Sequence, residues 1–292
     1  MTPEPSNGAA TVQLSDPQFG QLREFLYQRA GLHFADGKKF LLENRLQKRL
    51  RELGTLDVAG YLALVTSPVR GAAELRNLLD AVTTHETSFF RNRPQLEAFN
   101  KHVLRKLLEQ RVARGQRELR LWSAACSSGE EPYTLAMMLI ESLGEEIKRW
   151  NVSILGTDIA QTVLEKAKLG EYGRYSFRTT PAYFAGKYFE VRSRDLFCIR
   201  DEPRRLVEFK PLNFADSASM RLMRGFDAIF CRNALIYFDL DAKRRFVAQF
   251  AQSLNPGGFL FVGHSESLHG VSEAFKLIHF PGALAYQKPL PQ

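Results

Sequence analysis

The sequence has few of the features that mark secreted, membrane-spanning or zinc-binding proteins. Its 292 residues contain three cysteines, and Cys126, Cys198 and Cys231 lie far apart. This small, odd number argues against a disulfide framework or a metal site and favours a reducing, cytoplasmic location. The longest apolar runs resemble "TLAMMLI" (134–140) and are too short to cross a bilayer. The N-terminus lacks the basic, then apolar pattern of a signal peptide, and we expect a disordered tail over 1–14.

The chain has fewer acidic than basic residues. The chain has 40 Lys and Arg against 32 Asp and Glu, which gives a net charge of +8. Such a balance favours a negatively charged partner, either nucleic acid, an anionic membrane or an acidic protein surface. A basic surface that only aids solubility explains the charge equally well.

Two compositional regimes divide the chain. Residues 15–83 are expected to form a helical domain, because "SDPQFGQLREFLYQRAG" begins with a cap residue and ends in glycine. The following "KKFLLENRLQKRLRELG" carries leucines on one narrow arc, with Lys38, Arg45, Lys48 and Arg49 beside them. Residues 84–118 are expected to be a linker and part of a cleft.

From residue 119 to 292 strand patterns alternate with helix patterns. Such alternation predicts an α/β fold, with a mostly parallel sheet covered by helices on both faces. The last two strand patterns, "FKLIHF" and "ALAYQK", have a short connection and predict an antiparallel hairpin at one edge. Residues 172–206 are aromatic, basic and rich in turns, and we expect them to be an inserted β-subdomain.

The stretch "LRLWSAACSSGEEPYTLAMML" (119–139) predicts a strand, a tight turn and a helix. A dinucleotide-binding turn at this place would have three glycines, whereas this one has Gly129. Glu130 and Glu131 begin the helix, where a pyrophosphate would bind. Both can serve as partners of the helix dipole. Alternatively they bind a ligand with an ammonium or sulfonium group, and S-adenosylmethionine has both; we favour Glu131 for the ligand.

Polar residues follow three further strands, where ligands bind in such sheets. Asp158 ends the second strand and suits ribose hydroxyls, although an N-cap role explains it equally well. Asn213 follows the next strand and could bind an adenine edge. Arg232, Asn233 and Tyr237 follow the buried strand of "FDAIFCRNALIYFD", but Tyr237 could equally be a core aromatic.

Five motifs together resemble the CheR family of chemotaxis-receptor glutamate methyltransferases. They are "TTHETSFFR", "SAACSSGEEPYT", "GTDI", "FCRNALIYFD" and "GHSESL", and the resemblance extends over about residues 16–288 in order and spacing. It implies a helical N-terminal domain and a Rossmann-like S-adenosylmethionine-dependent methyltransferase domain with a small β-subdomain. The implied activity is transfer of a methyl group to glutamate side chains on the cytoplasmic helices of chemoreceptors.

The resemblance also implies roles for individual residues. Arg91 and Tyr237 would lie nearest the transferred methyl group, and Asp158 would bind the ribose. The basic helix with Lys38, Arg45, Lys48 and Arg49 would contact the acidic receptor. The implied cofactor-binding residues are His85, Thr87, Arg91, Glu130, Glu131, Asp158, Asn213, Phe214, Cys231, Arg232 and Asn233.

This sequence departs from the family pattern at two places. His85 stands where the family usually has asparagine. The segment "EVRSRDLF" (190–197) is shorter than in members that bind a receptor pentapeptide, and it lacks glycine. We therefore expect recognition of the receptor without a pentapeptide. Separately, we expect the enzyme to be a monomer.

Two other functions remain as alternatives. The first is a non-catalytic signalling module that binds S-adenosylmethionine or S-adenosylhomocysteine. The second is a nucleic-acid methyltransferase, but "RNALIYF" stands where base-modifying enzymes usually have an Asp/Asn-Pro-Pro-Tyr/Phe motif. We therefore expect no nucleic-acid partner and no membrane insertion.

Overall fold

The structure is a computed structural model that describes residues 12–55 and 57–291. It divides into two compact units, one ending at Thr84 and one beginning at His85. Most of the tail expected over 1–14 lies outside the described residues. Its last part belongs to the folded unit, because Val12 and Leu14 are buried and the Leu14 amide donates to Glu43 at 2.9 Å.

The first unit is helical. Its first helix begins at a capping box, in which the Ser15 hydroxyl accepts from the Gln18 amide while the Gln18 side chain accepts from the Ser15 amide. It ends at Gly31, whose φ of 71° is left-handed. Leucines such as Leu26 and Leu46 form the core and are fully buried. The helices are α1 (Asp16–Ala30), η1 (Asp36–Lys38), α2 (Lys39–Glu52), α3 (Val58–Thr66) and α4 (Gly71–Val82).

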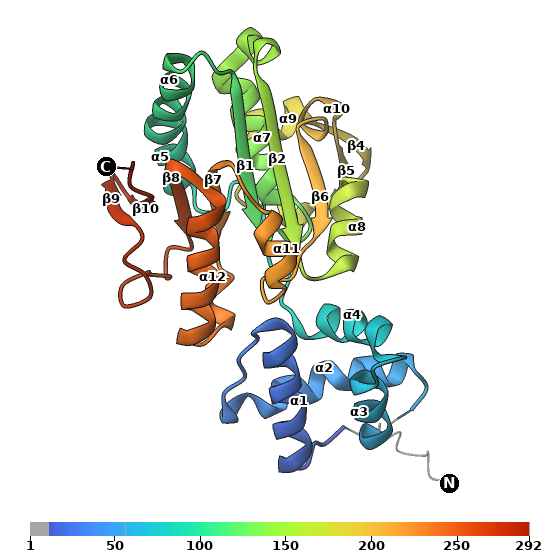
Figure 1. Ribbon diagram of the computed structural model, residues 1–292. Helices are drawn as coiled ribbons and strands as arrows, with labels where there is room; N and C mark the ends of the chain where they lie inside the picture. Colours follow the sequence, from blue (N-terminus) through green and yellow to red (C-terminus); the bar gives the residue numbers. More distant parts are fainter. Residues whose placement is uncertain (1–11, 56, 292) are drawn as a thin grey trace. The chain divides into compact units, whose positions relative to one another are not determined.

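The second unit is built on a seven-stranded sheet of order β6-β2-β1-β7-β8-β10-β9 (Figure 1). The pairs among the first five strands in this order are parallel, and β10 runs antiparallel to both β8 and β9. The predicted sheet and edge hairpin are therefore confirmed. The strands are β1 (Glu118–Ala124), β2 (Asn151–Asp158), β6 (Val207–Pro211), β7 (Phe226–Cys231), β8 (Leu254–Val262), β9 (Lys276–Phe280) and β10 (Ala283–Gln287).

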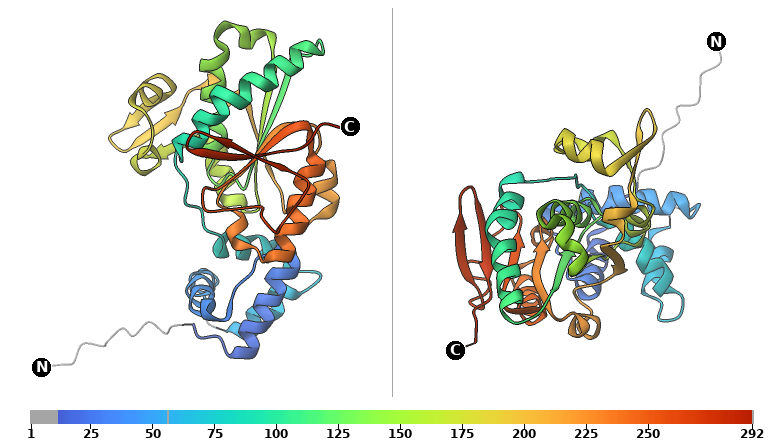
Figure 2. Two further views of the ribbon diagram at one scale, coloured as in Figure 1. Left: turned by 90° about the vertical axis from the view of Figure 1, so that its left-hand side faces the viewer. Right: turned by 90° about the horizontal axis from the view of Figure 1, so that it is seen from above.

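Helices cover both faces of this sheet. Figure 2 shows the orange α11 and α12 on one face and the green α6 and α7 on the other. This arrangement is the predicted α/β class. The carboxyl ends of the five parallel strands, where ligands bind in such sheets, lie along the same edge. The longer helices are α6 (Arg105–Ala113), α7 (Glu130–Leu143), α8 (Gln161–Leu169) and α12 (Leu240–Ser253), and the shorter ones include η3 (Gly144–Arg149), α11 (Ser217–Leu222) and η5 (Leu235–Tyr237).

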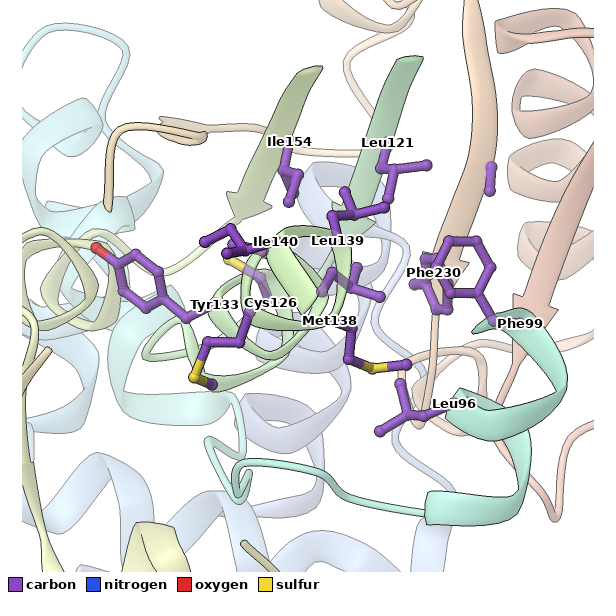
Figure 3. Close-up of a cluster of buried hydrophobic side chains, with 14 of the residues drawn as sticks. Leu96, Phe99, Leu121, Cys126, Tyr133, Met138, Leu139, Ile140, Ile154 and Phe230 are labelled. Atoms are coloured by element: carbon purple, nitrogen blue, oxygen red, sulfur yellow. The ribbon is translucent and has the colours of Figure 1, made fainter. Parts of the chain in front are cut away.

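Alternation along β1 sends neighbouring side chains into different cores. Leu121 points toward α7, where Leu139 and Ile154 also lie (Figure 3). Trp122 points to the opposite face, with its ring 5.4 Å from that of Phe250 in α12. The two cores fix β1, so the turn that follows it starts from a rigid strand.

The segment expected to be a linker is folded instead. Residues 93–113 form α5 (Arg93–Ala98), the π-helix η2 (Phe99–Leu104) and α6. Phe99 is fully buried against Phe230 of β7, with ring centroids 5.1 Å apart. This part of the chain is therefore a layer of the second unit. Within the described residues, no helix combines the length and the apolar character needed to span a membrane.

A separate three-stranded sheet lies in the region expected to be inserted. Its order is β3-β5-β4, and both pairs are antiparallel. Figure 2 shows it in yellow, apart from the main sheet. Hereafter this region, residues 171–206, is called the insertion. Its elements are β3 (Glu171–Gly173), η4 (Arg174–Phe177), α9 (Ala182–Tyr188), β4 (Phe189–Ser193), β5 (Leu196–Ile199) and α10 (Asp201–Arg204).

Candidate active site

The turn after β1 is strained and tightly packed. Ala125, Ser127 and Gly129 have φ values of 61°, 50° and 92°, and such left-handed values are uncommon for non-glycine residues. A Cβ on Gly129 would lie 2.8 Å from the Cβ of Ala167. Gly129 is therefore needed for the close packing of the turn against α8, as well as for its own φ.

The two adjacent glutamates face different surroundings. The Glu130 carboxylate accepts from the hydroxyls of Ser128 and Ser176, at 2.7 and 2.9 Å. Burial raises its pKa above the ordinary value. Glu130 therefore links the start of α7 to the insertion.

Glu131 lies at the strand ends. One of its carboxylate oxygens accepts from the Ser123 hydroxyl at 2.7 Å, and the other from Nη1 of Arg232 at 2.9 Å. The side chains of Arg232 and Glu131 are 4% and 13% exposed, so this ion pair is largely shielded from solvent. Burial raises the pKa of Glu131, while Arg232 and Ser123 oppose that rise. Of the two glutamates, Glu131 is the one beside β1 and β7.

Asp158 closes the turn from β2. Its two carboxylate oxygens accept from the amides of Ser127 and Ala160, at 2.8 and 3.0 Å. Burial raises its pKa against these bonds and the nearby charge of His85. The Ile159 amide also lowers the pKa of Asp158 through a hydrogen bond, so three backbone amides orient a carboxylate that has about four acceptor positions.

Two predicted cofactor-binding residues follow the next strand, β6, and Asn213 is the one predicted to bind the adenine. The Asn213 side-chain oxygen accepts from the Ala215 amide at 2.9 Å, which forms a local Asx turn. The Phe214 ring is packed among aromatic rings, with its centroid 5.2 Å from that of Phe250 and 6.3 Å from that of Trp122. A contribution of Phe214 to a ligand site would therefore have to come from its backbone. The same holds for Cys231, which is fully buried and whose thiol pKa burial raises.

The loop after β7 depends on a residue that our sequence analysis did not single out. One oxygen of the Glu266 carboxylate accepts from the amides of Asn233 and Gly263, and the other from the Ile236 amide at 3.1 Å. Asn233 has a φ of 60°, and Tyr237 lies one residue beyond Ile236. Glu266 therefore holds the loop that carries Tyr237. The sequence signal that could have identified Glu266 is the motif "GHSESL", which contains it and directly follows β8.

The segment from His85 to Arg91 lies against the same turn. The Ser127 hydroxyl donates to the His85 carbonyl at 3.2 Å, and Nη2 of Arg232 donates to the Arg91 carbonyl at 2.6 Å. The Arg91 guanidinium donates to the Glu86 carbonyl at 2.9 Å. The Thr87 carbonyl accepts from Arg178 of the insertion at 3.0 Å. Hydrogen bonds thus join this segment to the turn, to Arg232 and to the insertion.

The residues present fit S-adenosylmethionine. The carboxylates of Glu131, which accepts from Ser123 of β1, and of Asp158, which ends β2, suit an ammonium group and ribose hydroxyls. A turn of small side chains lies between them in sequence. Nε of Arg232 is buried, and no hydrogen-bond partner occurs for it among the described residues. A carboxylate such as that of the methionine part would satisfy this donor.

Comparison with known protein families agrees with this geometry. The family model described as "CheR methyltransferase, SAM binding domain" matches residues 85–283. The family model "CheR methyltransferase, all-alpha domain" matches residues 17–83. The chain is 34% identical to chemotaxis protein methyltransferase 2 of Vibrio cholerae, over 95% of each chain. It is 37% identical to the chemotaxis protein methyltransferase of Escherichia coli, covering 91% of this chain and 90% of that one. The corresponding Klebsiella aerogenes protein is 38% identical, covering 92% and 89%. The chain belongs to the CheR family of methyltransferases.

Proposed function

We propose that this enzyme transfers the methyl group of S-adenosylmethionine to glutamate side chains of chemoreceptors. The observation that carries the proposal is the pair of carboxylates beside β1 and β2 of a CheR domain, Glu131 bonded to Ser123 and Asp158 at the end of β2. Glu131, Asp158 and the unpaired Nε of Arg232 would bind the methionine and ribose parts. Asn213, His85 and Thr87 would complete the cofactor site. The substrate glutamates lie on cytoplasmic receptor helices, so the proposal also assigns the enzyme to the cytoplasm.

The proposed chemistry needs orientation and no general base. A substrate glutamate, with a reference pKa of about 4.3, is already ionised at neutral pH. When bound, S-adenosylmethionine supplies an electrophilic methyl group on its sulfonium. Arg91 would orient the incoming carboxylate, and the Tyr237 hydroxyl would donate a hydrogen bond weak enough to leave it nucleophilic. Such orientation can lower a barrier by about 7–11 kcal/mol.

Replacing Tyr237 by phenylalanine should lower the rate of methyl transfer about 10- to 100-fold, since one hydrogen bond to a charged group contributes roughly 1.5–3 kcal/mol. The measurement uses labelled S-adenosylmethionine and receptor cytoplasmic fragments, and counts base-labile methyl ester. Arg91→Ala should lower the rate as well. Tyr183→Phe is the control, because Tyr183 donates to Glu141 of α7 at 3.1 Å, outside the proposed site.

Binding of S-adenosylhomocysteine should be nearly unchanged in Tyr237→Phe, because the role proposed for this hydroxyl is in transfer. If the wild type binds the cofactor tightly but esterifies none of the receptors, the protein is a non-catalytic binding module and the proposal fails. Receptor fragments that end before any C-terminal pentapeptide should be methylated as well as full-length ones. The two-residue connection between β4 and β5, Arg194–Asp195, supports this independence.

The four predicted receptor contacts, three in the basic helix α2 and Lys38 at its N-cap, fall into two pairs. Arg49 makes a bidentate ion pair with Glu74, both bonds being 2.7 Å, and Arg45 donates to the carbonyls of Ala81 and Thr83. These two arginines are therefore part of the helical unit itself. Lys38 and Lys48 are exposed and form no ion pair among the residues described.

We expect Lys38→Glu/Lys48→Glu to raise the KM for an acidic receptor fragment roughly tenfold at low salt, with the loss shrinking as salt screens the charges. The kinetic measurement is made at two salt concentrations, and the KM for S-adenosylmethionine should not change. Lys101→Glu, with one exposed charge reversed in the second unit, is the control. An equal effect per reversed charge in Lys101→Glu would mean that net charge alone matters and would refute docking through the Lys38 and Lys48 side chains.

A further inference from the structure

The segment from Glu86 to Phe89 is bound by the insertion along its whole length. Arg178 donates to the Thr87 carbonyl at 3.0 Å and forms an ion pair with Glu86 at 3.3 Å. Thr179 donates to the Phe89 carbonyl at 2.7 Å. Since the Thr179 hydroxyl gives its proton to that carbonyl, Ser88, at 3.0 Å, must be its donor.

Aromatic packing strengthens the same junction. The Phe89 ring is fully buried, and its centroid lies 4.7 Å from that of Tyr172 and 4.9 Å from that of Phe189. The Phe90 ring lies 4.4 Å from that of Phe184 in α9. The two phenylalanines of "TSFFR" therefore belong to the core of the insertion, although they are distant from it in sequence.

The other side of this segment contacts the turn and α7. The His85 carbonyl accepts from Ser127, and the Phe90 amide donates to the Thr134 hydroxyl at 3.1 Å. Ser176 of the insertion reaches α7 directly, by its bond to Glu130. The segment is thus held between the insertion and the helix that begins at the proposed cofactor site.

We propose that Arg178 is a positioning residue for methyl transfer, which acts by holding the segment that carries His85, Thr87 and Arg91. The proposal rests on the proposed function, because that function gives these three residues their role toward the cofactor. It assigns the insertion a task that does not depend on receptor docking. Arg178 can perform it because its planar guanidinium donates to the Thr87 and Tyr175 carbonyls together while it covers the Tyr175 ring at 4.0 Å.

The test is calorimetric binding of S-adenosylhomocysteine without any receptor. Arg178→Ala should bind about tenfold more weakly than the wild type, the change expected when charge-assisted hydrogen bonds worth roughly 1.5 kcal/mol are lost. Arg178→Lys should be intermediate, because an ammonium keeps the charge without the fork of donors. Arg192→Ala is the matched control, since Arg192 is an exposed arginine of the same insertion whose ion pair is with Glu190.

A second variant tests the same contact in case Arg178→Ala fails to fold. Thr179→Val keeps the shape of the side chain and removes the hydroxyl that holds Ser88 and Phe89, and it should also weaken binding. Hydrogen exchange adds a local readout, because the Phe89 amide donates to the Ser176 carbonyl at 2.9 Å. That amide should exchange faster in Arg178→Ala, while amides in β7 should keep their wild-type rates.

The outcomes separate the two proposals. A wild-type protein that does not bind S-adenosylhomocysteine would refute the proposed function. A wild type that binds, with Arg178→Ala and Thr179→Val binding equally well, would leave that function standing and overturn the role of Arg178. Equal weakening by Arg192→Ala would also overturn it, because the effect would then belong to surface charge.

Discussion

Replacing Glu131 by alanine should lower the free energy of unfolding by about 3–5 kcal/mol, the usual effect of removing one partner of a buried ion pair. Arg232, whose side chain is 4% exposed, would keep its charge without the carboxylate that now balances it. The Ser123 hydroxyl, fully buried, would lose its acceptor as well. Chemical denaturation of wild type and variant measures the difference.

The exposed ion pair of Glu146 and Arg149 is the control for this prediction. Its side chains are 53% and 68% exposed, so Glu146→Ala should change the stability by no more than about 1 kcal/mol. Adding Arg232→Met to Glu131→Ala should restore part of the lost stability, since the charge left alone would be removed. If Glu131→Ala lowers the free energy of unfolding no more than Glu146→Ala does, the Glu131–Arg232 ion pair does not stabilise the fold.

Replacing Asp158 by alanine should weaken binding of S-adenosylhomocysteine about 100-fold, which corresponds to roughly 2.7 kcal/mol. The variant loses the acceptors proposed for the ribose hydroxyls, and it also frees the Ser127 amide that shapes the turn. Asparagine should not rescue binding. Both oxygens of Asp158 accept from backbone amides, and an asparagine NH₂ would point a donor at one of them. Calorimetry measures both variants.

Asp216→Ala provides the comparison. Asp216 also accepts from backbone amides, but as the N-cap of α11, and its pKa is lowered by its hydrogen bonds with Ser219. Its loss should reduce stability by about 1 kcal/mol, as for other caps, and leave the cofactor affinity unchanged. Comparable loss of binding in both variants would contradict a direct role of Asp158.

The sheet could be predicted from sequence because its signals are local. The segments "FKLIHF" (275–280) and "ALAYQK" (283–288) match β9 and β10 to within one residue at each end. The strand-end residues followed from the rule that ligands bind where parallel strands end. Neither inference required knowledge of which distant residues meet.

The parts that were missed depend on distant partners. Residues 93–113 were expected to form a linker because two short helices joined by a π-helix give no clear 3.6-residue period. Arg45 and Arg49 looked like surface charges, but their acceptors lie 25 or more residues further along the chain. Glu130 and Glu131 are neighbours in sequence, and only the fold separates the one that joins the insertion from the one that pairs with Arg232.

The backbone angles outline the site without reference to any ligand. The non-glycine residues with positive φ that the structure describes are Phe90, Asn92, Ala125, Ser127 and Asn233, and all lie in or beside the three segments around the strand ends. Asparagine adopts such angles readily, so the strain lies in Phe90, Ala125 and Ser127 and, at about 1–2 kcal/mol each, is a sizeable part of the roughly 5–15 kcal/mol net stability of a typical domain. The rest of the unit must oppose that strain, so a loss of stability anywhere in the sheet should loosen the site first. Thermal inactivation would then precede unfolding.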